Sequence, residues 1–384
     1  MPLRLLAALW PWLVFPLVTL WRARGSRTLD EVPALPPPPL PTVSVVIPAR
    51  DEAANIERVV RSVLATAYPA LDLVVVDDHS EDGTGALARA VAPDDPRLRV
   101  VDAPVLPPGW MGKQWACATG ARATSGEILL FTDADTTHAP DLVGRAVAEL
   151  RGRRVALLSV AGEQALHSFW ERVVQPHVLT VLLGRYGSTE RVTRSRNARD
   201  KIANGQCLFV ERAVYDALGG HEAVRDNVAE DLMLAQRTFG AGYEVAIVAG
   251  PRQLSTRMYT SLGTLVRGWR KNVYAGGREA MPFGALGRAI FPLLLLVPAL
   301  YSLVPVVLLA LALAGVLSAF TLLWTTIATG LLLLWWALVY ARLGLSPLWA
   351  LSFPLGAGVL LWIVIQAIAR GRRVEWKGRG YVSR

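Results

Sequence analysis

The sequence is poor in cysteine and in charge. Only Cys117 and Cys207 are cysteines among 384 residues, and they stand far apart. Two such residues exclude a disulfide framework and match no metal-ligand spacing, so we expect a reducing, cytosolic environment. The five histidines are scattered without HxxxH or HExxH spacing, which favours surface or packing roles. Charged residues make up 18% and hydrophobic residues 53%, which is more apolar than an ordinary soluble domain.

Charge is missing altogether from two long stretches. Residues 289–340 and 347–369 contain no Asp, Glu, Lys or Arg. Because roughly 20 apolar residues cross a bilayer, residues 289–370 predict about three membrane helices. Residues 1–24 predict a fourth. A cleaved signal peptide is the alternative there, but the tryptophans suit interfacial anchoring and no convincing cleavage site follows.

Basic residues gather beside the apolar segments. The formal net charge is +9, with arginines after the first segment and a basic tail over 371–384. This pattern predicts cytoplasmic flanks and attraction to anionic lipid, and no basic module indicates nucleic-acid binding. We therefore expect an integral protein of the cytoplasmic (inner) membrane with a cytosolic catalytic domain.

The predicted topology contains a conflict. A cytosolic domain after one span and three further spans would place the basic tail outside. Either one apolar segment does not cross, or 289–340 is divided differently. Pro292, Pro298 and Pro305 make its first part the candidate for a re-entrant or interfacial piece.

The region between the apolar segments predicts an α/β domain over 42–258, after a proline-rich linker over 25–41. Short apolar runs bounded by turn formers predict strands, with helical spacing between the first two. This order predicts a mostly parallel sheet covered by helices, in which ligands bind beyond the carboxyl ends of the strands. The four expected strands are 43–47, 73–76, 98–101 and 128–131.

Two basic amphipathic stretches flank the end of this domain, at 163–187 and 259–283. Such stretches lie in a membrane interface or pack on the sheet, and the sequence leaves both open. We assign 259–288 as an interfacial segment.

Three of the expected strands end in acidic residues. Asp51 and Glu52 follow the first, Asp77 and Asp78 the second, and Asp133 and Asp135 the fourth. Carboxylates brought into one crevice repel each other unless a cation or ligand donors lie among them. Mg²⁺ or Mn²⁺, held by one or two carboxylates and substrate phosphates, meets that need. We therefore predict a divalent metal at Asp135 and Asp133.

Four ordered motifs carry a family resemblance: VSVVIPARDEAANIERVVRSVL, LVVVDDHSEDGT, GKQWACATGARATSGEILLFTDAD and NVAEDLMLAQRTFGAGYEV. They resemble those of family 2 inverting glycosyltransferases with the GT-A, Rossmann-like fold, over about residues 42–275. PPGWMGKQWA and EWKGRGY are similar to stretches of the membrane-anchored branch that includes hopanoid-associated, carotenoid-type and ceramide glucosyltransferases.

The resemblance implies a role for each matching residue. Pro48, Asp51, Glu52, Asp77, Asp78 and Lys113 would bind the donor, with Asp133 shared between donor and metal. Within Glu230-Asp231, Asp231 would be the general base. Arg267 and Arg270 match a QxxRW-like element that binds the donor, although Lys271 replaces its tryptophan. Gly219, Gly220 and Trp269 would lie near the acceptor.

We therefore predict an inverting transferase that moves a hexose from a nucleotide sugar, with a UDP-sugar as the expected donor, to a hydroxyl of a membrane lipid. Alternatives are a polyprenyl-phosphate glycosyltransferase, a processive polysaccharide synthase, and a non-catalytic membrane scaffold with a degenerate transferase domain.

Overall fold

The computed structural model describes residues 2–279, 284–371, 373–377 and 379–382. It divides into two compact units. An α/β unit comprises Gly25–Ala165, Thr189–Met258 and Arg372–Arg384, and a helical unit comprises Met1–Arg24, Leu166–Ser188 and Tyr259–Gly371. The tail thus belongs with the α/β unit, whereas the sequence prediction treated it as separate.

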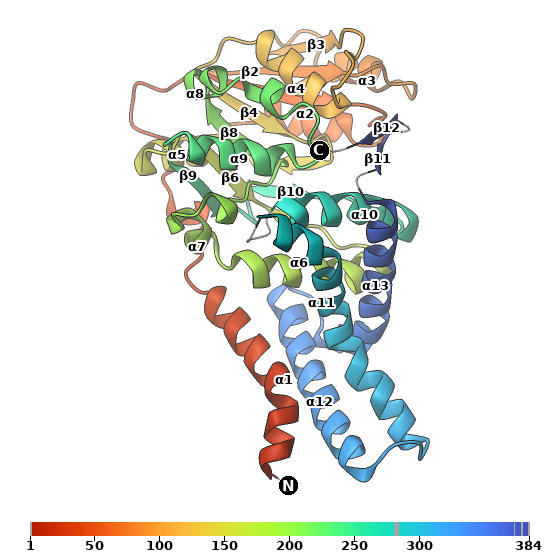
Figure 1. Cartoon of the computed structure of the whole chain (residues 1–384). Helices are drawn as coiled ribbons and strands as arrows, with labels where there is room; N and C mark the ends of the chain where they lie inside the picture. The colour runs from red at the N-terminus through yellow and green to blue at the C-terminus, as the bar shows by residue number, and fades with distance from the viewer. Residues whose placement is uncertain (1, 280–283, 372, 378, 383–384) are drawn as a thin grey trace. The chain divides into compact units, whose positions relative to one another are not determined.

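The α/β unit is built on a sheet that has seven strands within the described residues, in the order β3-β2-β1-β4-β8-β6-β9 (Figure 1). β1 runs parallel to β2 and β4, and β8 runs antiparallel to β4 and β6. This confirms the predicted mostly parallel mixed sheet. Its strands are β1 (Val43–Ala49), β2 (Leu71–Asp77), β3 (Leu98–Asp102), β4 (Ile128–Thr132), β6 (Leu157–Ala161), β8 (Cys207–Glu211) and β9 (Val245–Ala249).

Helices cover both faces of this sheet, because alternate side chains of its strands point to opposite faces. One core contains Ile47 with residues of α2 (Ile56–Leu64) and α5 (Leu142–Arg153). The other contains Val46 with residues of α4 (Gly112–Arg122), α8 (Arg212–Ala217) and α9 (Glu230–Gly240). A Cβ at Gly120 would lie 2.3 Å from Val46 Cγ1, so a glycine there lets α4 approach β1.

Smaller elements complete the unit. A second sheet joins β5 (Thr136–His138), β10 (Leu254–Thr256) and β7 (Glu163–Gln164), and begins directly after the acidic pair that follows β4. A hairpin of β11 (Arg373–Trp376) and β12 (Arg379–Val382) pairs residues of the tail. The remaining helices are α3 (Thr84–Ala90), α7 (Thr189–Arg194), and the 3₁₀ turns Leu29–Glu31, Ala198–Asp200 and Gly220–Val224.

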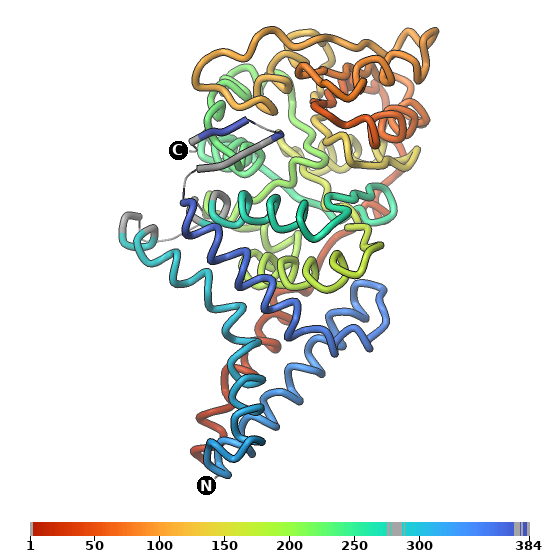
Figure 2. The backbone as a smooth tube through the Cα atoms, turned by 90° about the vertical axis from the view of Figure 1, so that its right-hand side faces the viewer, coloured from red at the N-terminus to blue at the C-terminus, as the bar shows by residue number. Residues whose placement is uncertain are grey.

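The helical unit contains the apolar segments. Four helices in the described part of the chain are long and apolar enough to cross a membrane, one near the N-terminus and three toward the C-terminus, as predicted. α11 continues as one helix through its three prolines, and it lies beside α12 and α13 (Figure 2). The unit consists of α1 (Pro2–Arg22), α6 (Phe169–Tyr186), α10 (Leu262–Glu279), α11 (Gly284–Leu313), α12 (Ala319–Arg342), the 3₁₀ helix Pro347–Ser352 and α13 (Phe353–Arg370).

Most of each basic amphipathic stretch forms a helix of the helical unit, α6 for the first and α10 for the second. α6 belongs to the helical unit, where Tyr340 Oη of α12 donates to Arg172 O at 3.1 Å, rather than to the sheet. α10 carries most of the second stretch, while residues 280–283 lie outside the described residues.

Candidate active site

Two loops at the carboxyl ends of β1 and β2 are held together by hydrogen bonds. The backbone N–H of Asp51 donates to Ser80 Oγ at 3.0 Å, and that of Glu52 donates to Thr84 Oγ1 at 2.8 Å. Asp77 Oδ1 in turn accepts from the backbone N–H of Ser80 at 3.0 Å. The structure therefore brings these predicted donor residues together, and gives Asp77 a structural task in shaping the loop.

β1 and β4 diverge toward their carboxyl ends, beside these two loops. β1 pairs with β2 as far as Ala49, but its pairing with β4 ends at Val46. Pro48 has no backbone N–H to extend the ladder toward β4, which permits the strands to diverge. In an open α/β sheet, ligands bind where neighbouring strands diverge and the strand order reverses.

Lys113, at the start of α4, bridges two carboxylates that come from distant parts of the sequence. Its Nζ lies 2.8 Å from Asp133 Oδ1, after β4, and 2.7 Å from Glu230 Oε1, at the start of α9. Burial alone would lower the pKa of Lys113, but the two carboxylates outweigh it and raise the pKa well above its usual value. The charge of Lys113 likewise outweighs burial at Glu230, whose pKa is lowered. The lysine is therefore charged and fixed between two anions.

Asp231 adjoins this ion-pair cluster, and its pKa is shifted in the opposite direction from that of Glu230. Its Oδ2 accepts the backbone N–H of Gly205, and its Oδ1 that of Leu232, both at 2.7 Å. Burial and the neighbouring charge of Glu230 raise its pKa to about 6, against the opposing effect of Lys113. A carboxylate whose pKa approaches neutrality is suited to accept a proton from a substrate.

Asp135 provides an observation that fits a metal ion. Its Oδ1 is buried and has no hydrogen-bond partner among the residues that the structure describes. Burial and the charges of Asp133 and Glu52 raise its pKa to about 7. No group of three or more His, Cys, Asp or Glu side chains in the described residues could hold a metal by itself. Asp133 and Asp135 fit a site in which the protein supplies two carboxylates and the substrate phosphates and water supply the other ligands of the cation.

A small pocket gathers several of these groups at the sheet edge. Five predicted residues line it, namely Pro48, Lys113, Asp133, Glu230 and Asp231. Cys117 and His221 also line it, and the sequence analysis missed them as site residues. Both are buried, and burial lowers the pKa of His221 to about 4, so it is neutral. No local sequence signal distinguishes them from the packing residues they were expected to be.

The predicted acceptor glycines have a packing role that the structure makes visible. Gly219 and Gly220 both have positive φ, at 80° and 48°. A Cβ on Gly220 would lie 2.3 Å from the Tyr215 ring. Tyr215 Oη also hydrogen-bonds His221 Nδ1 at 2.8 Å, so Gly220 supports the wall of the pocket that contains His221.

Arg267, Trp269 and Arg270 belong to α10 of the helical unit. Trp269 is buried, and its Nε1 donates to Gln175 Oε1 at 2.9 Å. Arg270 Nη1 donates to Gln366 Oε1 at 2.9 Å. Their predicted contacts with donor and acceptor stay predictions.

Comparisons with known proteins find glycosyltransferases. The family model described as Glycosyl transferase family 2 matches residues 44–219. A 4,4'-diaponeurosporenoate glycosyltransferase of Staphylococcus haemolyticus (strain JCSC1435) is 26% identical over 249 residues, which cover 63% of this chain and 63% of that protein. The protein of the same name from Staphylococcus aureus (strain MRSA252) is 26% identical over 245 residues, covering 62% and 63%. The match thus spans less than two thirds of these relatives.

The fold is also found in a solved structure. A mannosyltransferase of Pyrobaculum calidifontis, in complex with GDP-Man and Mn²⁺, aligns with a TM-score of 0.60 at 23% identity, over 96% of this chain and 97% of that one. This likeness shows the predicted GT-A-like α/β fold.

Proposed function

Because residues 44–219 match the family model described as Glycosyl transferase family 2, we propose that the protein is an inverting glycosyltransferase that moves a hexose from a nucleotide sugar to a membrane lipid. The observation that carries the proposal is the Lys113 bridge between Asp133 and Glu230, with Asp231 adjacent to it. It places a fixed cation and a carboxylate of raised pKa in one pocket, which are the two requirements of a displacement at an anomeric carbon.

The proposed reaction is a single in-line displacement. Asp231 takes the proton of an acceptor hydroxyl as its oxygen attacks the anomeric carbon. The bond from that carbon to the diphosphate breaks, and the electron pair leaves with the nucleoside diphosphate. Lys113 stabilises the charge that develops on the leaving group. The product is the inverted glycoside and a protonated Asp231, which returns its proton to water.

Asp133 and Asp135 would hold a divalent cation, Mn²⁺ or Mg²⁺, which supplies positive charge to the diphosphate when bound. The unpartnered Oδ1 of Asp135 supports this assignment. The complex of the mannosyltransferase neighbour with a nucleotide sugar and Mn²⁺ is compatible with it.

We place the donor nucleoside at the loops after β1 and β2. Asp51, Glu52 and Asp78 would bind the nucleoside of a UDP-sugar, and Arg267 and Arg270 its diphosphate. Gly219, Gly220 and Trp269 would adjoin the acceptor. The four apolar helices are compatible with membrane association, and we assign the protein to the cytoplasmic membrane with this domain in the cytosol. The relatives' named substrate, a carotenoid, supports an apolar acceptor.

The proposal is tested with the purified full chain, a panel of nucleotide sugars, Mn²⁺ and a total membrane lipid extract. Mass analysis should find a lipid heavier by one hexose with the wild-type protein and not with Asp231→Asn. Asp216→Asn, in the exposed part of α8, is the matched control and should keep full activity. Addition of a hexose to polyprenyl phosphate, or chains of several hexoses, would identify one of the alternative transferases instead.

A further inference from the structure

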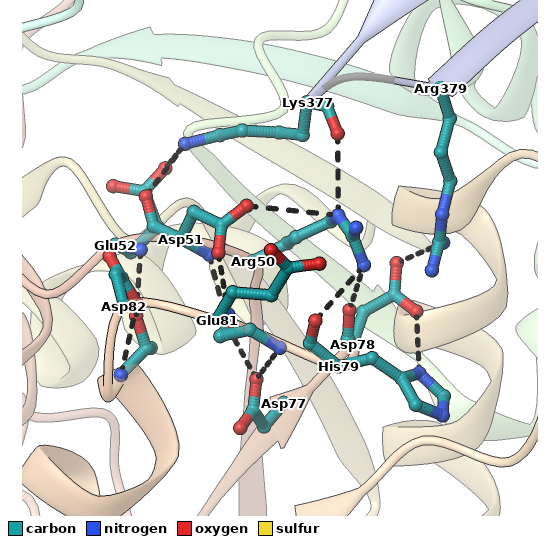
Figure 3. A network of polar contacts seen from close by, with 12 residues as sticks. Arg50, Asp51, Glu52, Asp77, Asp78, His79, Glu81, Asp82, Lys377 and Arg379 are labelled. Atoms are coloured by element: carbon teal, nitrogen blue, oxygen red, sulfur yellow. Dashed lines mark hydrogen bonds and ion pairs between the residues drawn. The ribbon is translucent and has the colours of Figure 1, made fainter.

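The basic tail of the chain reaches the carboxylates at the ends of β1 and β2 (Figure 3). Arg379 Nη1 lies 2.7 Å from Asp78 Oδ2, across 301 residues of sequence. Lys377 Nζ lies 2.8 Å from Glu52 Oε1 and donates to Asp51 O at 3.0 Å. The carbonyl of Lys377 accepts from Arg50 Nε at 3.4 Å. The tail therefore meets both loops of the proposed nucleotide pocket through its own cations.

The buried side chain of Asp78 has Arg379 as its cationic partner. Its side chain is fully buried, and its partners in the described residues are Arg379 on Oδ2 and, at 3.4 Å, His79 Nδ1 on Oδ1. A buried carboxylate without a cation or hydrogen-bond donors carries a large desolvation penalty. Arg379 supplies a full positive charge to one oxygen and leaves the other oxygen facing His79. It thereby fixes the orientation of the Asp78 carboxylate.

Arg50 ties the loops and the tail into one structure. Its Nη1 donates to Asp78 O at 2.5 Å and to His79 O at 3.2 Å, while its Nε reaches the tail. Figure 3 shows its guanidinium between Lys377 and the loop that carries Asp78 and His79. The β1 loop, the β2 loop and the tail thus share a single arginine.

The backbone at this junction is held in an uncommon conformation. Four non-glycine residues of the described chain have positive φ, and three of them meet here, namely Asp51 at 50°, His79 at 57° and Lys377 at 47°. Such left-handed residues are uncommon, and they persist where surrounding contacts over-determine them, as at binding sites. One comes from each of the three segments, which indicates that the loops and the tail are shaped for one another.

We infer that the tail hairpin is part of the donor nucleotide pocket, with Arg379 as the positioning residue for Asp78 and Lys377 as that for Glu52. This inference rests on the proposed function, because it takes Asp78 and Glu52 to bind the nucleoside of the donor. The tail completes the pocket from the opposite end of the sequence, and it stays in place when the nucleotide binds.

The test measures binding of UDP and of GDP, each with Mn²⁺, to the full chain in detergent by calorimetry. Arg379→Gln should weaken binding of the preferred nucleotide at least about tenfold, because it removes a charged partner of a buried group. Arg379→Lys should recover part of the loss. Arg196→Ala is the matched control, since Arg196 is 78% exposed and pairs with Glu244 at 2.6 Å away from the loops. It should bind as the wild type does.

A double-mutant cycle separates positioning from a general structural effect. In the Asp78→Asn background, Arg379→Gln should weaken binding much less than it does alone, because the carboxylate it positions is gone. In transfer assays, Arg379→Gln should raise the donor KM and leave kcat nearly unchanged. Thermal unfolding of each variant identifies any that fails to fold, and Lys377→Gln then serves as the second variant.

The outcomes distinguish the two claims. If the wild-type protein binds neither nucleotide, the proposed function fails and this inference with it. If it binds one and Arg379→Gln binds equally well, only the tail inference is overturned. Tighter binding by Arg379→Gln or Lys377→Gln also overturns it, since the tail would then compete for the site.

Discussion

Asp231 provides the sharpest prediction for the proposed mechanism. Only its ionised form accepts a proton, and its pKa is raised from 3.8 to about 6 by burial and by the charge of Glu230. At pH 7 about nine tenths of the carboxylate is ionised, and at pH 5 about one tenth. We therefore expect kcat/KM for transfer to be level above pH 7 and to fall about tenfold per pH unit below pH 6.

Substitutions test whether this inflection belongs to Asp231. Asp231→Asn should lower kcat by about 10²- to 10⁴-fold while nucleotide binding is retained, because the loss concerns proton transfer. Glu230→Gln removes the neighbouring negative charge, so the inflection of the remaining activity should move to lower pH. The assay is the initial rate of lipid glycosylation between pH 5 and pH 8, with Asp216→Asn as the control.

Titration of Asp231 does not unfold the protein between pH 7 and pH 5, so the expected fall in rate is not explained by acid unfolding at this residue. An acid whose folded pKa lies above its unfolded value binds protons more strongly in the native state, so its contribution to stability is present below pH 3.8 and is lost as pH rises toward 6. Lowering the pH from 7 to 5 thus favours the native state at this residue, and circular dichroism should show a folded protein throughout. A rate that stays level down to pH 5, or nearly full activity in Asp231→Asn, would refute the assignment.

Two further predictions follow from local geometry. Asp135→Asn should raise the unfolding temperature at pH 8 without divalent cations, because burial and neighbouring charges raise the Asp135 pKa to about 7 and make its ionised form costly. In the wild-type protein, Mn²⁺ should raise the unfolding temperature, and Asp135→Asn should abolish this increase. An equal effect of Mn²⁺ on the variant and the wild type would contradict the metal assignment. Gly220→Ala should cost about 1–3 kcal/mol of unfolding free energy, since its φ is 48° and its Cβ would lie 2.3 Å from Tyr215. Gly219→Ala should lower the unfolding free energy by less in the same denaturant titration, because its Cβ would lie 3.5 Å from the nearest atom, Ala223 Cβ.

The sheet and its acidic edge could be predicted because their signals are local. Each buried strand is a short apolar run with turn formers beside it, and the residues that follow it must emerge at the carboxyl edge. Asp133 was expected on these grounds and Glu230 from the family resemblance, and the structure joins them through Lys113. The pairing itself depends on where α4 and α9 begin relative to β4, which periodicity does not determine.

The amphipathic stretch at 163–187 shows why other parts could not be predicted. Its pattern of apolar and basic residues suits a membrane interface and a sheet face equally well. The structure divides it, with Glu163–Gln164 pairing as β7 and α6 joining the apolar helices. Local composition records which face of a helix is apolar and does not record what covers that face.

The tail is the strongest case of non-local information. A run of basic residues after the last apolar helix predicts a cytosolic flank that attracts lipid headgroups. Arg379 and Lys377 instead meet Asp78 and Glu52, more than 300 residues earlier. The acidic strand ends had seemed to require a metal to offset their repulsion, yet two of these carboxylates, Asp78 and Glu52, are paired with the chain's own cations. Asp133 after β4 is likewise paired with Lys113, whereas Asp135 Oδ1 has no hydrogen-bond partner among the residues that the structure describes. The acidic edge is therefore neutralised in part by cations from distant segments of the chain, and Asp135 is the carboxylate at which we propose the divalent cation.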